Sequence, residues 1–183
     1  VDATIDHLID DRLKEQGLRR NPPADRCTLI RRATHDLTGL PPTPEEIEQF
    51  VNDTDPQAWP NLIDRLMASP HYGERWGRHW LDVSRYADSN GKSRDVLFPH
   101  AWRYRNWVID AMNKDLPFNE FIVHQIAGDL IHLENQQESE DALVATGFLA
   151  IGSKPLVGGN LQLDLIDDQI DVVTRGFLGL TVS

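Results

Sequence analysis

Apolar residues recur along this chain at intervals of three and four, and no segment shows the period-two alternation that is typical of strands. Glycines, prolines and capping residues separate the apolar stretches. We therefore predict an all-α fold, a single globular domain of eight or nine helices with proline-rich turns, over residues 1–183. The predicted helices cover residues 3–16, 25–37, 43–52, 55–67, 70–87, 99–113, 119–130, 139–149 and 164–180.

The segment from His71 to Arg85 holds the densest mixture of aromatic, basic and acidic groups in the chain. Beside its apolar stripe runs a charged stripe, in which we expect Arg78 to pair with Glu74 and with Asp82. This helix should lie at the centre of the domain, where buried polar groups must find partners. The apolar stripe consists of Tyr72, Trp76, Trp80, Val83 and Ala87.

A second tryptophan-bearing helix is predicted at residues 99–113, and Arg105 projects from its apolar side. A guanidinium group on an apolar face is costly unless it is paired. We expect its partner to be Asp82, Asp88 or Asp129. The two tryptophan-bearing helices should then pack against each other.

The charge of the chain is unevenly distributed. The 183 residues carry a net charge of −11. Residues 115–183 contain 2 basic and 11 acidic residues, an excess that argues against nucleic acid and anionic membranes as partners. The balance of 40% hydrophobic and 26% charged residues is typical of a soluble globular protein, and no apolar run is long enough for a membrane span.

Several kinds of chemistry are excluded by the residue types. Cys27 is the single cysteine, so the chain can form neither an internal disulfide, nor a cysteine-based zinc site, nor a C-x-x-C-H haem attachment. Its position favours a small packing residue. The loop from Asp88 begins like a calcium loop, but Lys92 stands where a third ligand belongs. Motifs of serine hydrolases, phosphate-binding loops and zinc proteases are absent from the sequence.

The charged residues of the central helices allow two interpretations. They form either a structural ion-pair network or a ligand-binding pocket. His79 and Asp82, three apart on one helix, are weak candidates for acid–base catalysis or for a metal site, and a histidine satisfied within the core is the alternative. We therefore assign no catalytic residue and no metal ligand. The candidate ligand-binding residues are Arg75, Arg85, Asp88, Arg103, Arg105 and Asp129.

Both ends of the chain suggest a piece of a longer protein. Val1 is followed by neither the charged start nor the apolar core of a signal peptide. The last residues, 176–183, stop within an apolar segment. We interpret the chain as one helical domain of a longer multidomain protein.

Motifs in a fixed order along nearly the whole chain make it similar to a known family. It resembles the cytochrome-associated domain of unknown function found in large exported proteins of planctomycete-type bacteria. The motifs are Asp36-Leu-Thr-Gly-Leu-Pro-Pro-Thr-Pro-Glu45, Ser69-Pro-His-Tyr-Gly-Glu-Arg-Trp76, His79-Trp-Leu-Asp82, Arg85-Tyr-Ala-Asp88, Ala101-Trp-Arg-Tyr-Arg105, Asn113-Lys-Asp-Leu-Pro-Phe118, Gln125-Ile-Ala-Gly-Asp-Leu130, Ala145-Thr-Gly-Phe148 and Phe177-Leu-Gly-Leu-Thr-Val182.

The resemblance implies a periplasmic or cell-envelope location, with the domain between a c-type haem domain and a second uncharacterised domain. In such proteins a C-x-x-C-H-like segment commonly follows the last motif, and this chain ends there at Ser183. The implied cofactor is haem c in the parent protein, with none in this fragment. The implied partners are neighbouring domains of the same chain, including a c-type cytochrome domain. The resemblance implies no reaction.

Our main hypothesis is a non-catalytic helical module that scaffolds or docks a haem-c centre in an exported electron-transfer protein. One alternative is an enzyme domain that acts on a polysaccharide or other polymer-derived substrate through His79, Asp82 and the neighbouring arginines. Another is a protein-binding module, which would need an exposed apolar patch.

Overall fold

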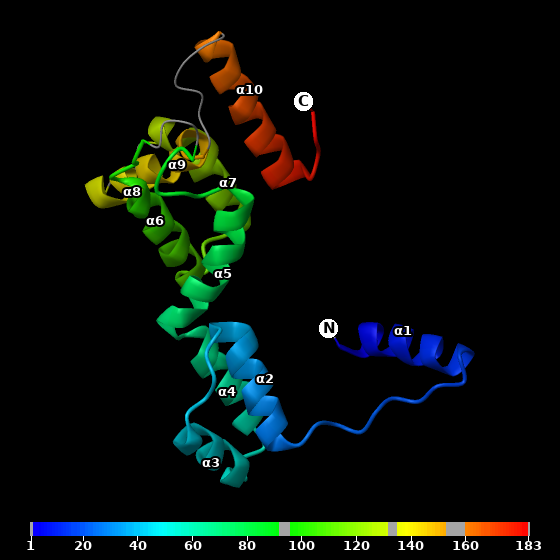
Figure 1. The fold of residues 1–183 in the computed structure, drawn as a ribbon. Helices are drawn as coiled ribbons and strands as arrows, with labels where there is room; N and C mark the ends of the chain where they lie inside the picture. Colours follow the sequence, from blue (N-terminus) through cyan, green and yellow to red (C-terminus); the bar gives the residue numbers. More distant parts are fainter. Residues whose placement is uncertain (1, 92–95, 132–134, 153–159, 183) are drawn as a thin grey trace.

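A computed structural model of the chain describes residues 2–91, 96–131, 135–152 and 160–182 (Figure 1). Within these ranges all regular elements are helical, and Ser89 and Leu97 form an isolated β-bridge. Nine helices have nine or more residues, so the predicted all-α fold is confirmed. The elements are α1 (Asp2–Glu15), α2 (Arg26–Thr38), α3 (Pro44–Asn52), α4 (Ala58–Met67), α5 (Pro70–Val83), α6 (Ala101–Asn113), α7 (Phe118–Ala127), the 3₁₀ turn η1 (Gly128–Leu130), α8 (Gln136–Ala145), the four-residue α9 (Gly147–Ala150), α10 (Leu161–Val173) and the π-helical turn η2 (Thr174–Leu178).

Local sequence explains where most of these helices begin and end. The Asp25 carboxylate accepts the Thr28 N–H at 2.8 Å and caps α2, and Gly39 ends that helix with a φ of 74°. Thr43 and Glu46 form a capping box at the start of α3. These ends depend on contacts within a few residues, so sequence alone places them well.

Several predicted boundaries are wrong, among them the end of the helix predicted at 70–87, which lies at Val83. Asn135 caps α8 by accepting the Gln137 N–H at 2.9 Å, so this helix begins before the expected Ser139. The helix α10 begins at Leu161 and passes into η2 at Thr174. Residues 132–134 and 153–159, which lie between predicted helices, are outside the described residues.

The core consists of two clusters, which lie at opposite ends of α5 (Figure 1). The smaller cluster joins α2, α3 and α4 around Ile30, Phe50 and Leu62. The larger cluster joins α6 to α10 around Val108 and Phe148, both with 0% exposure. Because α5 packs against both α2 and α6, it connects the two clusters. The expected central position of this helix is confirmed.

The predicted apolar stripe of α5 is buried only in part, because its Trp80 packs against the larger cluster but other members are exposed. Gly73 and Gly77 are buried against α6, whereas Trp76 keeps 40% of its surface exposed. The absence of side chains lets the two helices approach closely, with the start of α5 beside the end of α6. There the Asn113 amide accepts the Gly73 N–H at 2.8 Å and donates to the Pro70 carbonyl at 3.2 Å.

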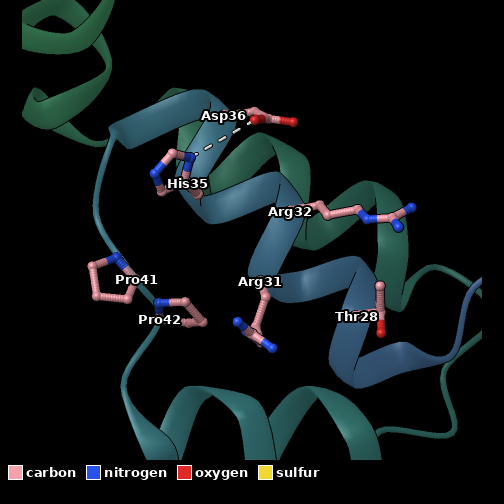
Figure 2. Close-up of a pocket in the computed structure, with 7 residues that line it drawn as sticks. All are labelled: Thr28, Arg31, Arg32, His35, Asp36, Pro41 and Pro42. Atoms are coloured by element: carbon pink, nitrogen blue, oxygen red, sulfur yellow. Dashed lines mark ion pairs between the residues drawn. The ribbon is translucent and has the colours of Figure 1, made fainter.

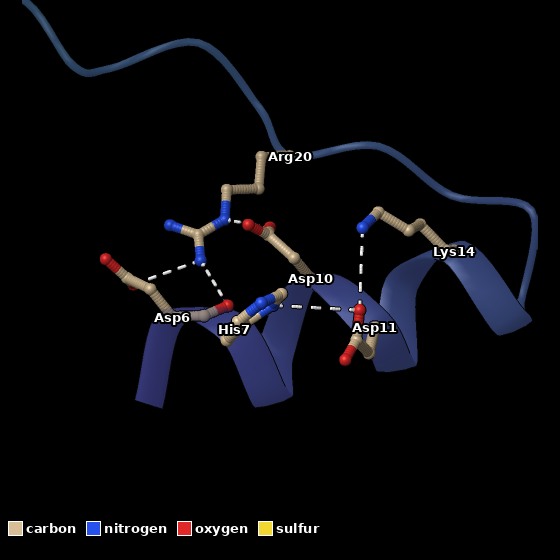
Figure 3. Close-up of polar contacts among 6 residues, drawn as sticks. All are labelled: Asp6, His7, Asp10, Asp11, Lys14 and Arg20. Atoms are coloured by element: carbon tan, nitrogen blue, oxygen red, sulfur yellow. Dashed lines mark hydrogen bonds and ion pairs between the residues drawn. The ribbon is translucent and has the colours of Figure 1, made fainter. Parts of the chain in front are cut away.

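The first helix lies apart from the other helices in Figure 1, and its apolar stripe is uncovered. Ile5, Leu8 and Ile9 are 56%, 68% and 48% exposed. Arg20, in the segment after α1, folds back to donate to the Asp6 carboxylate at 3.0 Å and also pairs with Asp10 (Figure 3). These contacts tie the segment to α1 itself.

Two further sequence expectations concern exposure. Cys27 is exposed, so the predicted packing role is wrong. No helix in the described part of the chain is long and apolar enough to cross a lipid bilayer.

The close approach of α5 to α6 can be tested by comparing alanine substitutions at its two glycines. A Cβ at position 73 would lie 2.4 Å from the Ile109 backbone oxygen, whereas at position 77 it would lie 3.3 Å from the Ile109 Cγ1 atom. We expect Gly73→Ala to lower the free energy of unfolding by about 2–4 kcal/mol, because backbone cannot move aside as a side chain can. Gly77→Ala should change it by about 1 kcal/mol or less, since alanine also favours the helix. Urea unfolding measures both, and equal losses would contradict the close contact.

Candidate functional site

The structure distributes the predicted ligand-binding residues over several separate environments. Arg85 has a φ of 57° at the end of α5 and donates through Nη1 to the Asp168 carboxylate on α10 at 2.8 Å. Arg75 lies at the other end of the domain, against Gly39 at the end of α2, and its buried Nε atom has no hydrogen-bond partner. Arg103 is exposed and lies over the Trp102 ring, 5.6 Å from its centroid.

Asp88 and Arg105 both lie near Tyr86. The Tyr86 hydroxyl donates to the Asp88 carboxylate at 2.7 Å. Burial, together with this hydrogen bond, raises the pKa of Tyr86 to about 12, and the charge of Arg105 opposes the rise. Within the described ranges no ion pair joins Arg105 to Asp82, Asp88 or Asp129, and its Nε atom contacts the Asn106 amide at 3.4 Å. The predicted neutralisation of Arg105 by a carboxylate is therefore wrong.

The remaining predicted residues also stay apart. His79 and Asp82 are both exposed on α5, and no hydrogen bond joins their side chains. The His79 ring contacts Trp76, with 5.5 Å between centroids. Asp129 is exposed in η1. The structure therefore does not bring these groups together in one cleft.

The predicted ion pairs along α5 are also wrong. Glu74 contacts the His71 Nδ1 atom at 2.7 Å, at the start of the helix. Arg78 forms no ion pair with Glu74 or Asp82 among the described side chains. An exposed i,i+4 pair contributes only a few tenths of a kcal/mol, so a closer competing partner displaces it readily.

The packing of the two tryptophan-bearing helices is confirmed, but a different polar group lies between them. The Trp80 Nε1–H donates to the Gln125 side-chain oxygen at 2.7 Å, and the Tyr104 hydroxyl donates to the same oxygen at 2.7 Å. The Gln125 amide donates to the Phe121 carbonyl at 3.0 Å. Gln125 is 0% exposed and Tyr104 is 2% exposed. This buried polar cluster is closed to solvent, so its role is to join α5, α6 and α7.

Sequence analysis missed Tyr104 and Gln125 as the partners of Trp80. One signal was present, because Gln125 lies among the apolar residues in the second half of α7. A buried amide of this kind needs a donor and an acceptor nearby. The sequence could not identify its donors, since they come from helices 21 and 45 residues away.

A hollow of about 420 Å³ lies beside α2, but it does not form a site. Its lining includes Arg31, Arg32 and His35. Figure 2 shows Arg32 pointing away from the prolines that form the other wall, and all three side chains are exposed. No ligand group would meet a converging set of donors here.

Exposed apolar side chains gather on α10, on the residues that follow it and at the end of α5, and we call this surface the apolar face. On α10, three apolar side chains share one side at intervals of three and four, yet they are 44–60% exposed rather than packed. In the segment that follows, Leu178, Leu180 and Val182 are 63%, 54% and 56% exposed. Val83 of α5 adjoins this segment, since its Cγ1 atom would lie 3.6 Å from a Cβ at Gly176. The members are Val83 (45%), Leu163 (60%), Ile166 (44%), Ile170 (48%), Leu178, Leu180 and Val182.

The comparison with known protein families supports the part of the sequence resemblance that concerns a domain of unknown function. The family model PSCyt2, described as "Protein of unknown function (DUF1549)", matches residues 4–183. The chain belongs to the PSCyt2 family. Among curated proteins and solved structures, none matches this PSCyt2 chain.

The buried polar cluster gives a first prediction for the PSCyt2 chain. Gln125→Leu removes the oxygen that accepts from both Trp80 and Tyr104. The Trp80 N–H keeps the Tyr104 oxygen as an acceptor at 3.1 Å, whereas the buried Tyr104 hydroxyl loses its acceptor, which costs about 1–3 kcal/mol. We expect a loss of about 2–3 kcal/mol in the free energy of unfolding, since the Gln125 bond to Phe121 is lost as well. Tyr104→Phe, which leaves the Trp80 bond to Gln125 in place, should lose about 1 kcal/mol. Urea unfolding of both variants tests this order, and the reverse order would contradict it.

A second prediction concerns alkaline pH. Burial raises the pKa of Tyr104 above its ordinary value near 10. The phenol therefore stays protonated in the folded state while it ionises in the unfolded state, so stability is lost as the pH rises above about 10. One such group contributes a slope of up to about 1.4 kcal/mol per pH unit. Tyr104→Phe should lose less stability than wild type between about pH 9.5 and 11.5, measured by urea unfolding, whereas parallel profiles would contradict it.

Proposed function

We propose that this PSCyt2 chain is a non-catalytic helical module that docks a neighbouring protein domain. We further propose that this neighbour is the c-type haem domain of an exported, periplasmic or cell-envelope electron-transfer protein. The observation that carries the docking role is the apolar face. The sequence motifs, which resemble a cytochrome-associated domain, carry the choice of partner.

The apolar face consists of seven exposed apolar side chains near the end of the chain and at the end of α5. Its members come from α5, α10, η2 and the residues after η2, and Val83 of α5 adjoins η2 at Gly176. Single exposed apolar residues are common, but contiguous apolar patches on soluble domains mark interaction sites. Burial of such a face contributes roughly 25 cal/mol per Å² of apolar surface removed from water.

The apolar face is held in place before any partner binds. Arg85 fixes α10 to the end of α5 through Asp168, with 33% and 15% side-chain exposure for the two residues. The Phe177 ring packs against Trp80 and Phe148 at centroid distances of 5.4 and 5.1 Å. A surface that is already ordered loses little conformational entropy on binding, which favours affinity.

The charged residues beside the apolar face indicate the charge of the partner's matching surface. Asp164 and Asp167 are exposed on α10, next to the apolar side chains. Residues 115–183 as a whole carry 2 basic against 11 acidic groups. A partner with an apolar centre and a basic rim would therefore match this surface in both respects.

The test is an isothermal titration of this chain with the purified, haem-matured c-type domain of the same polypeptide. We expect Ile170→Asp combined with Leu180→Asp to weaken binding by at least about tenfold, because a carboxylate would be buried at the centre of the contact. Both side chains are about half exposed, so the variant should keep its fold. Val51→Asp is the matched control, since Val51 is 42% exposed on α3, outside the apolar face.

Three outcomes would contradict the proposal. One is the absence of haem absorption in the visible spectrum of the longer polypeptide after haem maturation. Another is equal weakening of binding by the control variant. The third is a stable homodimer that forms through the apolar face, detected by light scattering, because a second copy would then be its occupant.

A further inference from the structure

The helix α10 is attached to the rest of the domain by few buried side chains. In α10, all of which is described, only Val172 is buried, and residues 161–167 are all exposed. By contrast, α6 buries five residues. An element with little buried apolar surface detaches at a lower free energy than the whole domain unfolds. The packing of α10 therefore allows it to open separately.

Charge repulsion within α10 adds to this weak attachment. Four carboxylates lie along the helix at intervals of three and four, and no basic residue lies within its bounds. Like charges four residues apart destabilise a helix. Arg175 of η2 pairs with Asp171 at 2.7 Å, which offsets the repulsion only in the last turn. The four carboxylates are those of Asp164, Asp167, Asp168 and Asp171.

The Arg85–Asp168 ion pair attaches α10 to the end of α5. The Arg85 Nη1 atom donates to the Asp168 carboxylate at 2.8 Å. The two side chains are 33% and 15% exposed, so water and salt screen this pair less than a fully exposed one. Arg85 is thus a cation from outside α10 that offsets the repulsion within the helix.

The conformation of Arg85 is costly while α10 is in place. Its φ of 57° is left-handed, which is unfavourable for an arginine, and its buried Nε atom has no hydrogen-bond partner among the described residues. Backbone strain of this kind persists only where the surrounding structure holds it. Detachment of α10 would let the Arg85 backbone relax and would let water reach the Nε atom. Both changes offset part of the free energy that is lost with the ion pair.

We infer that α10 opens from the domain as one unit and that the Arg85–Asp168 ion pair is the latch that keeps it closed. The turn η2 stays in place, because Phe177 packs against Trp80 and Phe148. The helix α10 therefore pivots at η2.

Opening of the latch takes the apolar face apart. It carries Leu163, Ile166 and Ile170 away from Val83 and Leu178, so the face is complete only when α10 is closed. The latch thus regulates docking at the apolar face, a consequence that rests on the function proposed above. A partner that binds only the closed arrangement shifts the population toward it.

Amide hydrogen exchange of this chain, followed by NMR at increasing urea concentrations, tests the opening. We expect the amides of α10 to exchange at least about a hundredfold faster than the buried amides of α6. Their exchange should also depend less on urea, because opening of one helix exposes less surface than global unfolding does. Equal rates and equal urea dependence for the two helices would overturn the inference, and this comparison needs only the wild-type chain.

Variants test the latch itself. Arg85→Gln should raise the exchange rates of α10 at least about tenfold, because a charge-assisted hydrogen bond is lost. Asp168→Asn added to Arg85→Gln should raise them no further, since the latch is then already broken. Arg65→Gln is the matched control, because the Arg65 ion pair with Glu46 joins α3 to α4 and stays intact when α10 opens. An unchanged α10 in Arg85→Gln, or an equal rise in the control, would show that this ion pair is not the latch.

These measurements use the chain alone, so they do not depend on docking. The haem-matured c-type domain, when added, should slow the exchange of α10. An unchanged rate would contradict the docking proposal, whereas the evidence for the latch would stand.

Discussion

The close approach of α5 to α6 is the constraint on which the remaining structure depends. Gly73 and Gly77 leave no side chain between the two helices, and a methyl group at position 73 would collide with backbone. Beside this contact the Trp80 indole donates to the Gln125 oxygen, which also accepts from the Tyr104 hydroxyl. The tryptophan then forms the centre around which the rings of α7, α9 and η2 pack. Glycines therefore permit the close approach of α5 and α6, and aromatic rings pack around Trp80 in the larger cluster.

The helices could be predicted because their ends depend on contacts between residues that are close in the sequence. Thr43 and Glu46 cap α3 through contacts three residues apart, and Gly39 ends α2 by its own backbone conformation. The side of α5 that is buried was not predictable in the same way. A stripe of tryptophans is more apolar than a stripe of glycines, but Gly73 and Gly77 permit close helix packing and Trp76 does not. The spacing of apolar residues identifies the helix, but it does not determine which side of the helix faces the core.

The candidate site was harder to predict, because the partner of a charged side chain depends on which groups lie near it in the folded chain. Arg105 had three plausible carboxylates in the sequence and forms an ion pair with none of them. Arg85 instead pairs with Asp168, 83 residues away, since α10 returns to the end of α5. An exposed ion pair contributes little to the free energy of folding. Which residues form such a pair therefore depends on where the backbone places them, and the pair does not determine the backbone. Sequence spacing therefore gives the available charges but not their contacts.

The apolar face and the hollow that Trp107, Glu120 and Asp141 help to line involve different elements. The apolar face involves α5, α10, η2 and the residues after η2, whereas the hollow involves α6, α7 and α8. Between them lie aromatic rings in contact, from Trp107 through Phe121 and Trp80 to Phe177, at centroid distances of 5.1, 5.0 and 5.4 Å. Close-packed side chains resist deformation, so we expect a change of charge at the hollow to leave the apolar face in place.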